Sequence, residues 1–97
     1  MNASQLKAAV AAQLPELVAI RRHLHAHPEL SGNEHQTAAL VAGELRGLGW
    51  RVQEGVGRTG VLAELGPEQN ASVVALRVDM DALPVEERSG PFASVHQ

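Results

Sequence analysis

The 97-residue sequence contains no cysteine and no tyrosine, and its only aromatic residues are Trp50 and Phe92. Without cysteine, these residues cannot form a disulfide bond, a thiolate metal site or a cysteine nucleophile. This absence is typical of a reducing compartment, and we expect the protein to be cytoplasmic. The core must be aliphatic, and the 25 Leu, Ile, Val and Phe residues are enough for the chain to collapse.

The sequence also lacks an excess of basic residues. Eight Lys and Arg face eleven Asp and Glu, which gives a net charge of −3 with histidine neutral. Binding to nucleic acid or anionic lipid therefore lacks its main electrostatic driving force, and we expect neither partner. Long apolar runs are absent as well. The apolar stretch after Lys7 is interrupted by Gln13, Pro15 and Glu16 and is shorter than the ~18–20 residues that a membrane span needs.

Apolar residues near the N-terminus recur every three or four positions, which predicts an amphipathic helix. They are Leu6, Val10, Leu14, Leu17, Ile20 and Leu24. We expect Ser4 to cap this helix, and we expect it to end near Ala26 because the residue before Pro28 avoids the helical region. Pro15 either kinks the helix or lies in the first turn of a second segment.

A second helix has signals at both ends. Asn33 is a typical cap with Gln36 three residues later, and Gly49 is a typical left-handed stop. One face of this helix carries Leu40, Val41, Leu45 and Leu48. Gly43 and Gly47 each cost ~1 kcal/mol of helix propensity relative to alanine, which leads to the hypothesis that they mark a close approach to a neighbouring element.

The second half of the chain has the pattern of strands. Residues 50–56 and 60–65 are short runs separated by the three residues 57–59, which predicts a β-hairpin. Residues 72–78 form a nearly continuous apolar run, which is typical of a central strand covered on both faces. The sequence therefore predicts an α/β fold in which two N-terminal helices precede a β-hairpin and a central strand.

Three histidines alternate in the segment RRHLHAHPE, at His23, His25 and His27. Neutral imidazole is a common zinc ligand, so a histidine metal site is one interpretation. On a helix, however, His25 would point away from the other two, and Pro28 interrupts the helix there. The alternative is a helix C-terminus at which cationic side chains offset the helix dipole.

Two carboxylates, Asp79 and Asp81, follow directly after the apolar run. In open α/β sheets, ligands bind at the carboxyl ends of central strands, so these acids are the candidate site residues. Spaced by two on an extended chain, they could orient a histidine ligand or hold a cation between them. They could equally mark the return of the chain to solvent. Arg77 needs a partner if the strand is buried, and Glu64 or a ligand carboxylate would serve.

Taken together, the motifs RRHLHAHPELSGNEHQTA, VVALRVDMDALPVEE and SGPFAS resemble the N-terminal part of metal-dependent amidohydrolases. The similar enzymes are of the hippurate hydrolase, N-acyl-amino-acid amidohydrolase and auxin-conjugate hydrolase type, within a wider family of zinc carboxypeptidases and aminoacylases. The resemblance implies a three-layer αβα catalytic domain. It also implies two divalent metal ions, zinc by resemblance, that activate water to cleave an N-acyl amino acid or a small peptide.

The resemblance also implies that Asp81 lies near the metals and orients their ligands without binding a metal itself, and that Asp79 is its neighbour. It assigns no role to His25, His27 or Glu29. The ligands themselves come from a HACGHD-like motif soon after the segment that matches residues 92–94, then from a downstream Glu-Glu pair and later histidines. The HACGHD-like motif does not occur in residues 1–97. We therefore expect residues 1–97 to be an incomplete N-terminal portion of a metallohydrolase catalytic domain that binds no cofactor and is inactive alone.

The alternative from another class is a small α/β interaction or adaptor protein without catalysis. An uncovered face of the 72–78 strand would then be its partner surface, because large exposed apolar patches usually mark contacts. For the incomplete domain, we expect the exposed sheet to contact either the remainder of the enzyme or a second copy of the chain.

Overall fold

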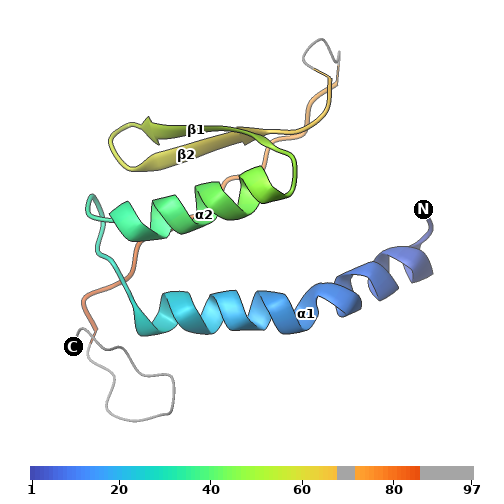
Figure 1. Cartoon of the computed structure of the whole chain (residues 1–97), viewed down its shortest axis with the longest axis horizontal. Coiled ribbons are helices and arrows are strands. Elements are labelled where there is room, and N and C mark those ends of the chain that lie inside the picture. The colour runs from blue at the N-terminus through green and yellow to red at the C-terminus, as the bar shows by residue number, and fades with distance from the viewer. Residues whose placement is uncertain (68–71, 86–97) are drawn as a thin grey trace. The chain divides into compact units, whose positions relative to one another are not determined.

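The computed structural model describes residues 1–67 and 72–85, so the SGPFAS motif lies outside the described residues. The described chain divides into two units, Met1–Pro28 and Glu29–Val85. The first unit contains α1 (Ala3–Ala26). The second contains α2 (His35–Gly47), β1 (Arg51–Val56) and β2 (Gly60–Glu64), as Figure 1 shows. The predicted order of two helices and a hairpin is confirmed.

Helix α1 begins earlier than predicted, and its cap is Asn2. The Asn2 side chain accepts a hydrogen bond from the Gln5 amide at 2.8 Å, and the Gln5 side chain accepts one from the Asn2 amide at 2.9 Å. This reciprocal capping box replaces the predicted Ser4 cap, which was wrong because Ser4 already lies inside the first turn. Pro15 lies inside one continuous helix, whose axis bends along its length in Figure 1.

Helix α2 also begins without the predicted cap. Its N-cap residue is Glu34, whose side chain makes no capping hydrogen bond. The predicted cap, Asn33, lies one residue too early, in a turn where its amide donates to the Leu30 carbonyl oxygen at 2.9 Å. The first amides of α2 must therefore find their acceptors elsewhere in the chain.

The C-terminus of α2 confirms the predicted stop at Gly49, which has a φ of 92°. The Gly49 amide donates to the Arg46 carbonyl oxygen, and the Trp50 amide donates to the Leu45 carbonyl oxygen, both at 3.0 Å. This pair of bonds is a Schellman motif, which needs a left-handed residue and therefore favours glycine. It turns the chain directly from α2 into β1.

The hairpin has the predicted strands and three-residue loop. Strands β1 and β2 are antiparallel, from Arg51 opposite Glu64 to Val56 opposite Gly60, with an irregularity of register at Gly55. Gly55 has a φ of 71°, which suits glycine. Gly60 is required for a different reason, because a Cβ at this position would collide with the Val56 carbonyl oxygen.

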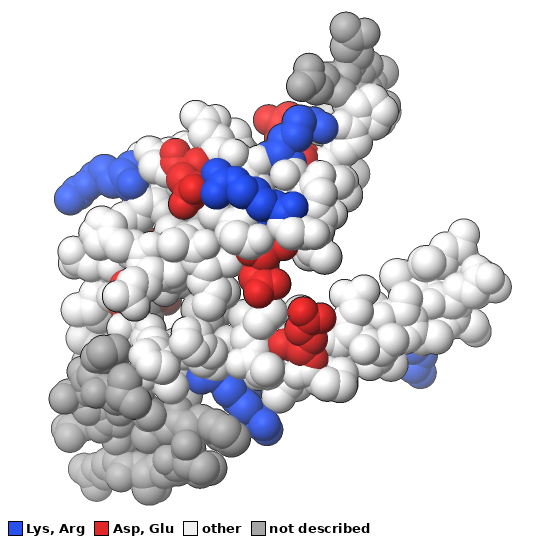
Figure 2. Space-filling view, viewed as in Figure 1, with Lys and Arg blue, Asp and Glu red and all other residues white. Residues whose placement is uncertain are grey.

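Helix α2 packs against both strands of the hairpin. Ala38 and Ala42 are the buried apolar residues of the described chain, and both belong to α2. Exposed charges join the same elements at the surface, where Arg46 and Glu54 form an ion pair at 2.7 Å and acidic and basic side chains lie side by side in Figure 2. Such exposed pairs contribute little to stability.

The hypothesis that Gly43 and Gly47 mark a close approach was wrong for the described residues. A Cβ added at either glycine would have no described atom within 4 Å.

The predicted central strand at residues 72–78 was also wrong, since this segment forms no hydrogen-bonded ladder with any described residue. Its apolar side chains are almost fully exposed, with Val73 at 83%, Val74 at 96% and Leu76 at 89%. A strand exists only when a neighbour accepts and donates its ladder bonds, and an apolar pattern does not supply that neighbour. The α/β arrangement of helices and hairpin is nevertheless as predicted.

The expected partner of Arg77 changes with the missing strand. Arg77 Nη2 lies 3.1 Å from Asp79 Oδ1, while Glu64 Oε2 lies 3.7 Å from Arg51 Nη2. Arg77 therefore pairs two residues along its own segment, at an exposed position where a charge needs no buried partner. Within the described ranges, no helix combines the length and the apolar character needed to cross a bilayer.

Candidate functional site

Within the second unit, Glu29 and Leu30 of the HPEL motif lie beside the DMDALP motif. Leu30, in the HPEL motif, forms a parallel β-bridge with Ala82, in the DMDALP motif. The Ala82 amide donates a hydrogen bond to the Glu29 carbonyl oxygen at 2.8 Å. Segments about fifty residues apart in sequence are thus joined by main-chain bonds, and Asp81 is held next to the bridge.

The Glu29 side chain holds the start of α2. One carboxylate oxygen accepts a hydrogen bond from the Thr37 amide at 2.6 Å, and the other accepts one from the Gln36 amide at 3.2 Å. These are the second and third residues of the helix, whose amides an N-cap side chain normally satisfies. Glu29, which lies six residues before the helix, therefore satisfies the first-turn amides that the predicted cap Asn33 does not contact.

These contacts set the ionisation of Glu29. Desolvation raises the pKa of this carboxyl, but hydrogen bonds from the Thr37 side chain and from the Thr37 and Gln36 amides lower it, as does the charge of His35. The net pKa lies below the ordinary value of 4.5. Because the folded-state pKa is lowered, the contact contributes its full stability above that ordinary value and loses it as the pH falls through the folded value.

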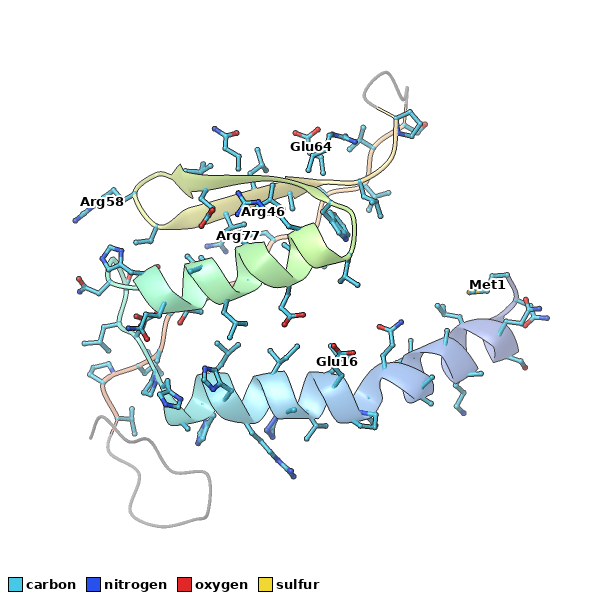
Figure 3. All side chains as sticks on the ribbon, in the orientation of Figure 1. Met1, Glu16, Arg46, Arg58, Glu64 and Arg77 are labelled. Atoms are coloured by element: carbon cyan, nitrogen blue, oxygen red, sulfur yellow. The ribbon has the colours of Figure 1, made fainter. Side chains whose placement is uncertain are left out.

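A second carboxylate, Glu34, holds the hairpin loop against the same helix end. Glu34 and Thr59 are each only 8% exposed, and the Thr59 hydroxyl donates to Glu34 Oε2 at 2.8 Å. The other carboxylate oxygen accepts from the Asn33 amide at 3.1 Å. Arg58, one residue before Thr59, has a φ of 87°, and Figure 3 shows its side chain at the hairpin tip, pointing away from α2.

The predicted site residues, Asp79 and Asp81, are both exposed. The Asp79 side chain is 69% exposed and pairs with Arg77. The roles assigned to Asp81 and Asp79 by resemblance stay predictions. In residues 1–67 and 72–85, no three His, Cys, Asp or Glu side chains converge in a way that could hold a metal ion. The described donor set therefore does not fit a metal centre.

The alternating histidines belong to the C-terminus of α1. His23 and His27 stack with ring centroids 4.5 Å apart, and His27 Nδ1 donates to the His23 carbonyl oxygen at 3.0 Å. His25 lies between them on the last turn. Bonding to one of the last carbonyls of the helix is the arrangement expected from the interpretation of these residues as a helix terminus.

Sequence reasoning missed the polar side chains that meet around the start of α2. It noted Glu29 without a role and gave none to Glu34, Thr37 or Thr59. The signal for Glu29 was an acidic residue seven and eight positions before the first-turn amides of α2. Asn33 has the residue type and position of an ordinary helix cap, so the sequence favoured Asn33 instead.

We predict that Thr59→Val lowers the free energy of unfolding by about 1–3 kcal/mol, because it removes the donor to a buried carboxylate oxygen. Thr59→Ser keeps the hydroxyl and is the matched control. Urea unfolding followed by circular dichroism measures both variants. Equal stability of the valine and serine variants would show that the contact between Thr59 and Glu34 contributes nothing.

Comparison with known proteins gives the same family as the motifs. The chain is 56% identical over 94 residues to a "Probable hydrolase" of Synechocystis sp., covering 95% of this chain and 24% of the relative. It is 43% identical over 83 residues to the N-acetyl-L-cysteine deacetylase of Bacillus subtilis, covering 84% and 20%. It is 43% identical over 95 residues to the N-acyl-L-amino acid amidohydrolase of Geobacillus stearothermophilus, covering 97% and 26%.

No family model and no solved structure matches the chain. The chain spans about a quarter of the length of the relatives that it matches. The resemblance drawn from the motifs is confirmed: this chain is similar, over nearly all of its length, to a segment of hydrolases of the amidohydrolase type.

Proposed function

We propose that this chain is part of the catalytic domain of a metal-dependent amidohydrolase that cleaves the amide bond of N-acyl amino acids. The observation that carries the proposal is similarity over 95% and 97% of the chain to a hydrolase and an amidohydrolase, which includes the HPEL and DMDALP motifs. Two of the relatives are named for removing an acyl group from an amino acid. The shared chemistry is hydrolysis of an amide to a carboxylate and a free amine.

The proposal extends to small peptides as substrates and to two divalent metal ions, zinc by resemblance, in the complete enzyme. The described residues do not provide the ligands, because no group of three suitable side chains converges and Asp79 is paired with Arg77. Within the proposal, Asp81 orients the ligands and Asp79 is its neighbour. The bridge between Leu30 and Ala82 lies directly after Asp81.

We predict that the purified 97-residue chain is inactive and binds no stoichiometric zinc. Two or three solvated carboxylates are weak ligands compared with a set that includes histidine. The measurement is zinc content by mass spectrometry, together with release of amino acid from an N-acetyl amino acid. The Geobacillus stearothermophilus relative serves as the positive control. One or two zinc ions per chain, with turnover that a chelator abolishes, would contradict the prediction.

A second candidate is an interaction protein without catalysis, and the exposed apolar segment 72–78 favours it. Val73, Val74 and Leu76 present apolar surface of the kind that usually binds a partner. In the hydrolase proposal the same surface is covered by the remainder of the enzyme, or, in the isolated chain, by self-association.

Sedimentation velocity combined with thermal unfolding separates the two candidates. The hydrolase proposal predicts association that increases with concentration and a broad thermal transition, because none of the large apolar side chains in the described part of the chain is fully buried. A monomer that unfolds cooperatively at all concentrations would favour the independent interaction protein instead.

A further inference from the structure

Glu29 makes hydrogen bonds through both its side chain and its main chain, in two directions. Its carboxylate accepts from the Gln36 and Thr37 amides at the start of α2. Its carbonyl oxygen accepts from the Ala82 amide, which lies directly after Asp81. Glu29 therefore contacts both α2 and residues 79–82, which carry Asp79 and Asp81 and are called the acidic segment below.

The geometry of the chain makes these two contacts interdependent. The carboxylate and the carbonyl share one Cα, so anchoring the side chain on the helix limits the rotation of the main chain that carries the carbonyl. The next residue is restrained too, because the Leu30 carbonyl oxygen accepts from the Asn33 amide at 2.9 Å. Loss of the carboxylate contacts would free this segment, and the Glu29 carbonyl would no longer be fixed toward Ala82.

The acidic segment depends on this tether because its preceding residues form no ladder. Residues 72–80 have no regular secondary structure, and the apolar side chains among them are exposed. The bond between Ala82 and Glu29 and the bridge between Leu30 and Ala82 hold the segment to the second unit. Whatever holds the Glu29 carbonyl therefore also fixes the C-terminal end of the segment that carries Asp79 and Asp81.

We propose that Glu29 is a positioning residue, whose carboxylate contact with α2 holds the acidic segment 79–82 in place. Functional side chains must be held within about 0.5 Å of their working geometry, and supporting contacts of this kind provide that precision. As a statement about catalysis this inference rests on the proposed amidohydrolase function. The coupling itself is a property of the 97-residue chain and is measurable without activity.

The test is amide hydrogen–deuterium exchange of the 97-residue chain at micromolar concentration, read residue by residue by mass spectrometry. Glu29→Ala should lower the protection of the Gln36, Thr37 and Ala82 amides together, by about tenfold, because each loses a hydrogen bond or its support. Glu29→Gln keeps one acceptor oxygen and should restore part of the protection at all three. Glu44→Gln, an exposed change on the same helix, is the matched control and should alter none of them.

A simple helix cap gives a different result. In that case Gln36 and Thr37 lose protection in the alanine variant while Ala82 keeps its wild-type rate, and the proposal is wrong. If the alanine variant unfolds, the glutamine variant decides, since an unchanged rate at Ala82 beside faster exchange at Gln36 or Thr37 again overturns the coupling. An unprotected Ala82 in the wild-type chain overturns it too. None of these results depends on whether a complete enzyme hydrolyses N-acyl amino acids.

Discussion

The start of α2 needs hydrogen-bond acceptors that its own sequence does not supply, and the second unit is organised around that requirement. The first amides of any α-helix have no carbonyl within the helix to bond to. Here the N-cap side chain makes no capping bond, and the carboxylate of Glu29 accepts from the Gln36 and Thr37 amides instead. An acidic side chain is well suited to this position, because it also interacts favourably with the positive end of the helix dipole.

Two further segments are held through the same helix end. The Glu34 side chain does not cap the helix. It accepts a hydrogen bond from the hydroxyl of the buried residue Thr59 instead, and this contact fixes the hairpin loop. The Glu29 carbonyl accepts from Ala82, which fixes the acidic segment. The packing behind these contacts is thin, since Ala38 and Ala42 are the buried apolar residues among those described. Polar contacts therefore determine the arrangement of the loops more than the apolar core does.

Most of the regular structure could be predicted because its signals are local. The apolar spacing of α1, the left-handed glycine after α2 and the loop at 57–59 each depend on residues close in sequence. The caps were predicted wrongly because Ser4 and Asn33 have suitable side chains but lie one or two residues away from the actual helix starts. The strand at 72–78 failed because pairing requires a neighbour that an apolar run does not specify. The role of Glu29 depends on tertiary contacts in two directions, which no local pattern shows.

The family resemblance followed from the HPEL and DMDALP motifs, and the structure adds that these motifs touch. The natural absence of cysteine allows a direct measurement of that contact. In a Leu30→Cys, Ala82→Cys variant, adjacent positions of the bridge should form an intramolecular disulfide under mild oxidation, because bridged residues have the Cα separation that a disulfide needs. A Leu30→Cys, Leu76→Cys variant should form one far more slowly. Equal rates of disulfide formation in the two variants would contradict the adjacency of Leu30 and Ala82, and with it the positioning of the acidic segment by Glu29.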